Sequence, residues 1–106
     1  MAVIAKFIYE VQPARMGDFL GKLRQAADAK FNSPVMPKSM RLFRSTVPGP
    51  ETGHVIMLIE YEDMAAYGAR TTFENKNQDW KKLFAAQSDS PERLISVELL
   101  TEFKPA

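Results

Sequence analysis

The sequence predicts one small α+β domain with the element order β-α-β-β-α-β, in which two helices cover one face of a four-stranded antiparallel sheet. Segments in which apolar and polar residues alternate, typical of strands, are separated by segments in which apolar residues recur every three or four positions, typical of helices. The length of 106 residues matches the commonest domain size, and the apolar fraction of 45% is ordinary for a globular protein. We therefore interpret residues 1–106 as a single ferredoxin-like domain.

The first strand and the first helix follow each other directly. Residues 3–11 alternate, with Val3, Phe7 and Val11 on one face, and the strand is expected to end at Gln12 and Pro13 because proline lacks the ladder donor. From residue 14 the period changes to that of an amphipathic helix ending near residue 31. Its apolar stripe consists of Met16, Phe19, Leu20, Leu23, Ala27 and Phe31.

The second and third strands are predicted to form a hairpin. They occupy residues 38–47 and 54–62, and the connection at residues 48–53 is rich in proline and glycine. The third strand alternates cleanly, with Val55, Met57, Ile59 and Tyr61 on one face. The second strand is ambiguous, because its apolar residues fall on both faces.

The second helical region is predicted to be broken. Asp63 suits the N-cap of a helix that opens at Met64, and Asn77 suits a second N-cap, with Asp79 in the first turn. We expect a short helix, a kink at residues 75–77 and a second helix to about residue 87. The last strand is expected over residues 94–103.

The sheet face turned away from the helices is predicted to be unusually apolar. It carries Ile4, Ile8, Ile56, Leu58, Leu94 and Leu100, interleaved with Lys6, Glu10, His54, Glu60 and Glu98. A soluble monomer rarely exposes such a patch, so we expect a second copy to cover it and form a homodimer. The candidate dimer interface is Ile4, Ile8, Ile56, Leu58 and Leu100, and the alternative is a monomer with a bare apolar face.

Composition argues against several kinds of partner and site. The 14 basic and 13 acidic residues nearly cancel and the bases are scattered, so no nucleic-acid partner is expected. The chain has no cysteine and one histidine, so we expect no thiolate or histidine metal cluster and no cofactor. It shows no signal-peptide layout and no stretch that would span a membrane, so a cytoplasmic location without membrane contact is expected.

A ligand pocket is predicted between the broken second helix and the sheet, because a kink leaves a gap there. Its candidate residues are Tyr9, Arg44, Tyr61, Tyr67, Asn75 and Trp80. A mostly aromatic lining with a few polar groups suits a small apolar or aromatic ligand. The alternative is that these aromatic residues are simply part of the core.

Acid–base candidates are present but weakly indicated. The carboxylates form possible pairs, Glu60 with Glu98 or Glu10 with Glu62, although pairing with lysine or arginine across strands is the simpler interpretation. His54 is either a histidine at the end of a strand or a general base with a pKa near neutral. The catalytic residues therefore stay unassigned.

Several stretches resemble the dimeric α/β barrel superfamily, and within it the NIPSNAP-like branch. They are Gly53-His54-Val55 through Tyr61-Glu62-Asp63-Met64-Ala65-Ala66-Tyr67, then Asn77-Gln78-Asp79-Trp80, and the closing strand with Glu98 and Glu102. The resemblance covers nearly the whole chain. It implies a homodimer whose two sheets form a barrel with the helices outside.

The resemblance leaves the function open. Some relatives are cofactor-free monooxygenases that act on polyketide quinols, and others are haem-degrading oxygenases that use an Asn, a Trp and a His. This chain has those residue types but not in a matching motif, so their roles are not carried over. Three hypotheses follow: a binder of a small, partly apolar ligand, a cofactor-independent monooxygenase-like enzyme acting on an aromatic substrate, and a dimerisation or interaction module without activity.

Overall fold

The computed structural model describes residues 2–46, 49–50, 53–103 and 105 and has the predicted order of elements. The strands are β1 (Val3–Val11), β2 (Ser39–Arg44), β3 (Val55–Tyr61) and β4 (Glu92–Thr101). The helices are α1 (Met16–Ala26), α2 (Met64–Lys76) and α3 (Gln78–Phe84), with short 3-10 turns η1 (Pro13–Arg15) and η2 (Ala29–Phe31).

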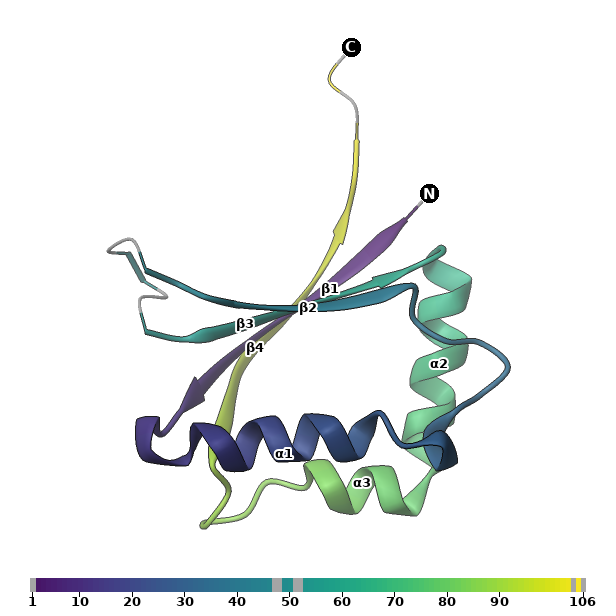
Figure 1. Cartoon of the computed structure of the whole chain (residues 1–106). Helices are drawn as coiled ribbons and strands as arrows, with labels where there is room; N and C mark the ends of the chain where they lie inside the picture. Colours follow the sequence, from purple (N-terminus) through teal and green to yellow (C-terminus); the bar gives the residue numbers. More distant parts are fainter. Residues whose placement is uncertain (1, 47–48, 51–52, 104, 106) are drawn as a thin grey trace.

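The four strands form one antiparallel sheet in the order β2-β3-β1-β4. The first and third strands are therefore central, as the ferredoxin-like order requires. All three helices lie on one side of this sheet (Figure 1). α1 and α3 run side by side beneath it, and α2 rises to meet the end of β3 (Figure 1).

The main differences from the predicted element boundaries concern four elements. One of them is α3, which ends at Phe84 rather than at about residue 87. The first helix is split, because the Asp28 side chain accepts a hydrogen bond from the Lys30 amide and begins η2. β2 ends at Arg44 rather than at residue 47, and the predicted end of that strand and part of its turn lie outside the described residues. β4 begins at Glu92, two positions earlier than expected.

The predicted break in the second helical region is confirmed at Asn77. α2 ends at Lys76, and the Asn77 side-chain oxygen accepts a hydrogen bond of 3.0 Å from the Trp80 amide, which begins α3. Asp63 caps the start of α2 in the same way, accepting from the Ala66 amide at 2.8 Å. Each cap satisfies an amide that has no partner within its helix.

The core lies between α1 and the two central strands. Phe19 and Leu23 of α1 pack on Tyr9 and Met57, which fixes the odd-numbered side chains of β1 and β3 on the helix side of the sheet. Phe19 is completely buried. Five apolar residues pack at the margin of this cluster: Phe7, Met16, Leu20, Ile59 and Phe84.

A bulge in β4 changes which face Leu94 occupies. Ile8 lies opposite Ser96, but the next residue, Tyr9, lies opposite Leu94, so Ile95 is the extra residue. Leu94 therefore lies on the helix side of the sheet, as Tyr9 does. The prediction that Leu94 lies on the other face of the sheet is wrong. A register read from strict alternation cannot detect such an insertion.

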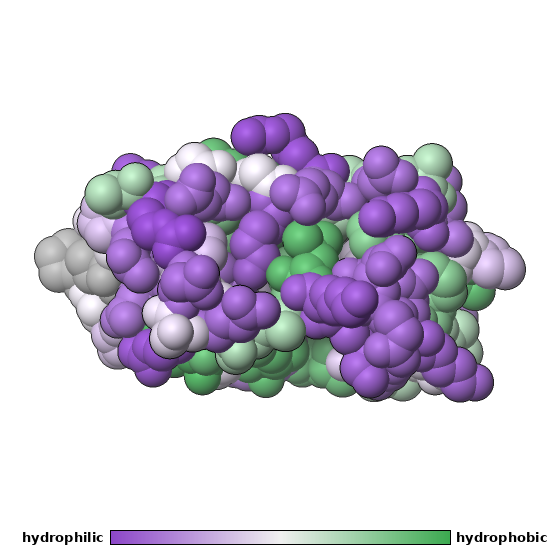
Figure 2. Space-filling model, turned by 90° about the horizontal axis from the view of Figure 1, so that it is seen from below, coloured by the Kyte–Doolittle hydropathy of each residue, from purple (hydrophilic) through white to green (hydrophobic). Residues whose placement is uncertain are grey.

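Apolar side chains remain exposed on both faces of β4. Val97 and Leu99 lie on the helix side, opposite Phe7 and Ala5, and are 43% and 40% exposed, while Leu100 on the other face is 39% exposed. The C-terminal half of this strand rises beyond the helices (Figure 1). By contrast, the outer surface seen from below, over α1 and α3, is mostly hydrophilic (Figure 2). Among the residues described, no helix combines the length and apolarity needed to cross a membrane.

Candidate ligand cavity

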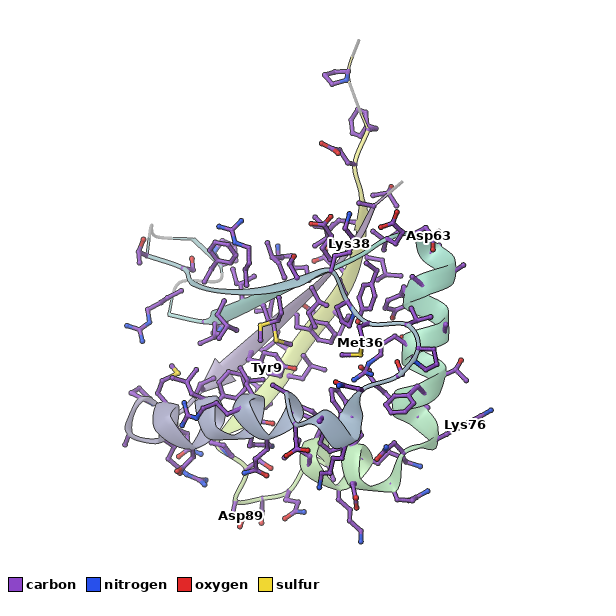
Figure 3. The ribbon with its side chains drawn as sticks, turned by 45° about the vertical axis from the view of Figure 1, so that its right-hand side comes forward. Tyr9, Met36, Lys38, Asp63, Lys76 and Asp89 are labelled. Atoms are coloured by element: carbon purple, nitrogen blue, oxygen red, sulfur yellow. The ribbon has the colours of Figure 1, made fainter. Side chains whose placement is uncertain are left out.

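A cavity of about 1190 Å³ lies between the helices and the sheet, beside the packed core that α1 forms with β1 and β3. We call it the helix–sheet cavity. Its floor is the helix side of β1 and β3 with Tyr9, Met57 and Tyr61, and its walls come from α1, α2, α3 and the start of β4. The segment between η2 and β2 contributes Met36, and Tyr9 and Met36 both lie on the helix side (Figure 3). The lining is mainly apolar with a few polar groups, the usual chemistry of a small-molecule site.

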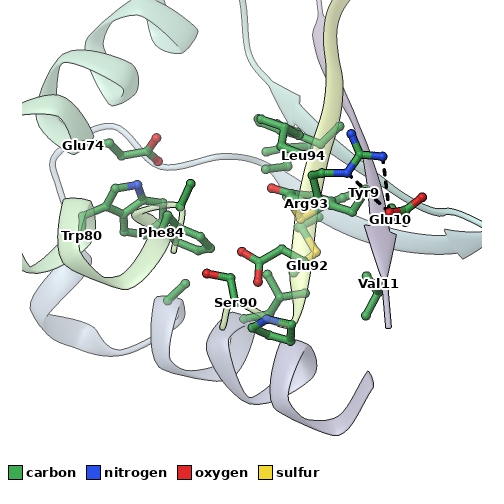
Figure 4. A pocket seen from close by; sticks show the side chains of 18 of the residues that line it. Tyr9, Glu10, Val11, Glu74, Trp80, Phe84, Ser90, Glu92, Arg93 and Leu94 are labelled. Atoms are coloured by element: carbon green, nitrogen blue, oxygen red, sulfur yellow. Dashed lines mark hydrogen bonds and ion pairs between the residues drawn. The ribbon is translucent and has the colours of Figure 1, made fainter. Parts of the chain in front are cut away.

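One wall of the cavity is aromatic. The Trp80 ring meets Phe31 edge to face, with a centroid distance of 5.2 Å, and lies 5.0 Å from Phe84 in a tilted arrangement. Asn77 sets this wall, because the helix that it caps presents Trp80 and Phe84 four positions apart on one face. Figure 4 shows both rings on one side of the cavity and Leu94 across from them.

Arg70 of α2 is the most deeply buried charged residue among those described, at 3% exposure. Its Nε donates to Glu74 Oε2 at 2.9 Å, and its Nη1 donates to the Phe31 carbonyl oxygen at 2.6 Å. Nη1 also reaches Met36 Sδ at 3.3 Å. The guanidinium lies over the Trp80 ring, 5.2 Å from its centroid. This residue therefore ties α2 to the segment that follows η2 and supports the aromatic wall.

Glu74 lies one turn after Arg70 and faces the cavity. Burial raises the pKa of its carboxyl above the ordinary value of 4.5, although the hydrogen bond and charge of Arg70 oppose this. Burial, followed by the charge of Glu74, also raises the pKa of Tyr61 to about 12. The Tyr61 hydroxyl therefore stays protonated at neutral pH.

Glu92 enters from the opposite side, at the start of β4. Its two carboxylate oxygens accept hydrogen bonds from Lys22 Nζ at 3.0 and 2.8 Å, and its side chain is 8% exposed. Burial, followed by the charges of Glu92 and Glu74, raises the pKa of Tyr9 to about 12. The Tyr9 hydroxyl therefore stays protonated at neutral pH.

The structure brings together only part of the predicted pocket. Tyr9, Tyr61 and Trp80 line the helix–sheet cavity, whereas Arg44, Tyr67 and Asn75 are not among its described lining residues. Tyr67 packs edge to face on Tyr61 with a centroid distance of 5.3 Å. Asn75 is exposed, because the register of α2 turns its neighbour Glu74 to the cavity instead. Arg44 lies opposite Val55 at the end of β2.

Sequence reasoning missed the charged groups of the cavity. Arg70 and Glu74 carry a readable signal, since a base and an acid four positions apart lie on one face of a helix. Glu92 pairs with Lys22, which is seventy positions away in sequence, and no local pattern indicates that contact. Met36 lies in an irregular segment with no periodicity to place it.

Of the acid–base candidates, Glu10 lines the rim of the cavity, whereas Glu60, Glu62 and Glu98 are not among its described lining residues. Glu10 pairs with Arg93 at 3.3 Å, and Lys38 Nζ lies 3.8 Å from Glu60 and 3.4 Å from Glu62. His54 does not belong to the described residues that line the cavity. Its Nδ1 atom is buried and has no hydrogen-bond partner in the described part of the chain. No group of three or more potential metal ligands gathers among the described residues.

Comparison with known proteins identifies the fold. No family model and no curated protein matches the chain. Among solved structures, an uncharacterised NIPSNAP domain protein from Burkholderia xenovorans superimposes with a TM-score of 0.67 at 11% identity, over 100% of this chain and 98% of that one. The fold of this chain is NIPSNAP-like.

Two further structures share this NIPSNAP-like fold. A candidate antibiotic biosynthesis monooxygenase from Caulobacter crescentus CB15 matches with a TM-score of 0.63 at 23% identity, over 97% of this chain and 91% of that one. A dimeric ferredoxin-like protein from an uncultured marine organism matches with a TM-score of 0.60 at 18% identity, over 98% of this chain and 100% of that one. At these sequence identities the likeness shows the fold alone, so the function has to be argued from the residues of the site.

Proposed function

We propose that this chain binds a small, partly apolar aromatic molecule in the helix–sheet cavity. The observation that carries the proposal is the cavity itself, because about 1190 Å³ of space between helices and sheet exceeds what a packed core leaves open. Its apolar lining supplies binding energy, and Tyr9, Tyr61 and Glu74 supply polar groups that orient a ligand.

The second candidate function is a cofactor-independent monooxygenase-like activity on an aromatic substrate. It is favoured by the likeness to the candidate monooxygenase from Caulobacter crescentus and by the position of Trp80 and the two tyrosines in the cavity. The third, a module without activity, requires a filled space between helices and sheet, and the cavity argues against it.

We also propose that two copies associate through the outer face of the sheet, the face turned away from the helices. Ile4, Ile56 and Leu58 are half-buried there, and Leu100 is 39% exposed. Ile8, on the same face, is already 3% exposed in the single chain and adds little. Covering the half-buried and exposed side chains removes apolar surface from water, which is the usual driving force of association. The likeness to a dimeric ferredoxin-like protein agrees with this assembly.

Thermal shift measurements test ligand binding. A panel of aromatic alcohols, amines and carboxylic acids with one to three rings should include compounds that raise the melting temperature saturably, because ligands stabilise the state that binds them. The matched variants are Ala26→Phe, which places a ring in the cavity, and Ala69→Phe, which places the same ring on the exposed side of α2.

The stabilisation should survive in Ala69→Phe and disappear in Ala26→Phe. The proposal is contradicted if no compound stabilises the wild type, or if both variants respond like the wild type. Turnover of a stabilising compound in air, abolished by Trp80→Phe in a folded protein, would favour the monooxygenase-like candidate over binding alone.

A further inference from the structure

Two carboxylates face the helix–sheet cavity from opposite walls. Glu74 enters from α2 and Glu92 from the start of β4, with open space between them (Figure 4). One oxygen of Glu74, Oε2, is held by Arg70. The other, Oε1, has no hydrogen-bond partner among the described residues. The cavity therefore offers at least one carboxylate oxygen for a donor carried by a ligand.

The nearby cations are committed to protein partners. The Nε and Nη1 atoms of Arg70 are occupied by Glu74, the Phe31 carbonyl oxygen and Met36 Sδ, and aromatic rings cover the guanidinium. Lys22 is bound to both oxygens of Glu92 and is not among the described lining residues. Nη2 of Arg70 has no hydrogen-bond partner among the described residues, but the guanidinium is already paired with Glu74. A ligand carboxylate would therefore meet a neutralised cation beside acceptors and negative charge.

The remaining cation of the described lining lies at the rim. Arg93 pairs with Glu10 at 3.3 Å, and their side chains are 69% and 56% exposed. Charges so exposed to water are screened and interact weakly with a ligand inside the cavity. In the interior, a cation of the protein already lies over two of the aromatic rings that a ligand would meet. Arg70 lies over the ring of Trp80. Lys22 Nζ lies 5.7 Å from the centroid of Phe84. These rings therefore supply apolar packing surface, and the free oxygen of Glu74 carries the charge selection.

From these contacts we infer that the helix–sheet cavity selects aromatic amines over aromatic carboxylates of the same skeleton. The ammonium group would bind Glu74 Oε1 while the rings pack against Trp80, Phe84 and the apolar floor. This inference rests on the proposed ligand-binding function and names the class of ligand for that site.

The test compares three probes that share one apolar body: diphenylpropylamine, diphenylpropanol and diphenylpropionate. The chain has one tryptophan, Trp80, so its emission reports occupancy of the cavity directly. At neutral pH we expect the amine to bind about tenfold more tightly than the carboxylate, with the alcohol between them, since a single favourable charge contact corresponds to about that factor. Equal affinities, or tighter binding of the carboxylate, would overturn the inference.

The variant Glu74→Gln keeps the shape of the side chain and removes its charge. It should bring the amine-to-carboxylate ratio close to one, and the affinity for the alcohol measures any general loss of binding in the same variant. Glu62→Gln, an exposed residue outside the cavity lining, is the matched control and should keep the wild-type ratio. A wild-type ratio retained in Glu74→Gln would also overturn the inference.

Failure of this inference differs from failure of the proposed function. If none of the probes binds to the wild type, both fall. If the alcohol binds but the amine has no advantage over the carboxylate, ligand binding stands and the selectivity falls. The wild-type ratio needs no variant, so the result does not depend on whether Glu74→Gln folds.

Discussion

The Nη1 atom of Arg70 lies 2.6 Å from the carbonyl oxygen of Phe31, thirty-nine residues earlier in the chain. This contact joins α2 to the turn η2 at the back of the aromatic wall. Phe31 in turn meets Trp80 edge to face, so one hydrogen bond and one ring contact hold three segments together. The shape of the helix–sheet cavity depends on this arrangement.

Arg70→Ala is expected to lower the free energy of unfolding by about 3 kcal/mol, because the buried guanidinium and its contacts are lost and the half-buried Glu74 is left without its partner. Urea unfolding followed by circular dichroism measures the change. Asp18→Ala removes an exposed partner of Arg15, whose side chain still donates to the Asp89 carbonyl oxygen, and should cost less than about 1 kcal/mol. Similar losses in the two variants would contradict the structural role of Arg70.

Asn77→Ala is expected to lower the free energy of unfolding by about 1 kcal/mol, the usual value of an N-cap. The lost contact is the 3.0 Å hydrogen bond to the Trp80 amide. Asn75→Ala is the matched control, because Asn75 is exposed and lies within α2, where alanine is well tolerated. An Asn77 variant as stable as the Asn75 variant would show that the cap contributes nothing.

The raised pKa of Glu74 predicts a particular pH dependence of stability. An acid whose pKa is higher in the folded state stabilises the fold below its unfolded pKa, near 4.5, and loses that contribution as pH rises through the folded pKa. The wild type should therefore lose stability relative to Glu74→Gln as pH rises from about 4.5 toward neutral. Melting temperatures of both proteins across this range test the sign, and a difference that does not change with pH would refute the prediction.

Tyr9 and Tyr61 should ionise far above the ordinary value of 10. The pKa of each is raised to about 12, so ultraviolet titration should show two late transitions in the wild type and one in Tyr9→Phe. Because the pKa is higher in the fold, the protonated hydroxyl stabilises it below pH 10, and the contribution is lost as pH rises through about 12. Ionisation of all tyrosines near pH 10 in the folded protein would contradict the burial of these rings.

Leu100→Glu is expected to separate the proposed dimer. Leu100 is exposed in the single chain, so a charge there should disturb the association without unfolding the monomer. Light scattering coupled to gel filtration should give twice the chain mass for the wild type and the mass of one chain for the variant. Met64→Glu, on α2, should keep the wild-type mass. A wild type of one chain mass would contradict the dimer.

The sequence predicted the fold because its signals are local. Alternation in β1 and β3, the helical stripe of Phe19 and Leu23, and the cap at Asn77 each lie within a few residues, and the structure confirms them. The bulge at Ile95 was missed because one inserted residue leaves the composition of β4 unchanged while moving Leu94 to the other face. Local patterns therefore predict the helices and strands, but they do not predict on which face of the sheet every side chain lies.

The cavity was harder to predict than the fold. The break at Asn77 indicates a gap between the second helical region and the sheet. Tyr9, Tyr61 and Trp80 were predicted to lie at this gap, and all three line the helix–sheet cavity. The contacts of Arg70 with Phe31 and of Lys22 with Glu92 join segments far apart in the chain, and one sequence alone carries no signal for them. The charge pattern that selects a ligand is thus a tertiary property.

The most direct test of ligand binding in the helix–sheet cavity is a crystal structure of the protein soaked with diphenylpropylamine. We predict density for one molecule in the helix–sheet cavity, with its rings against Trp80 and Phe84 and its ammonium group at Glu74. A cavity filled by the protein's own side chains, or a probe bound only elsewhere, would contradict this prediction.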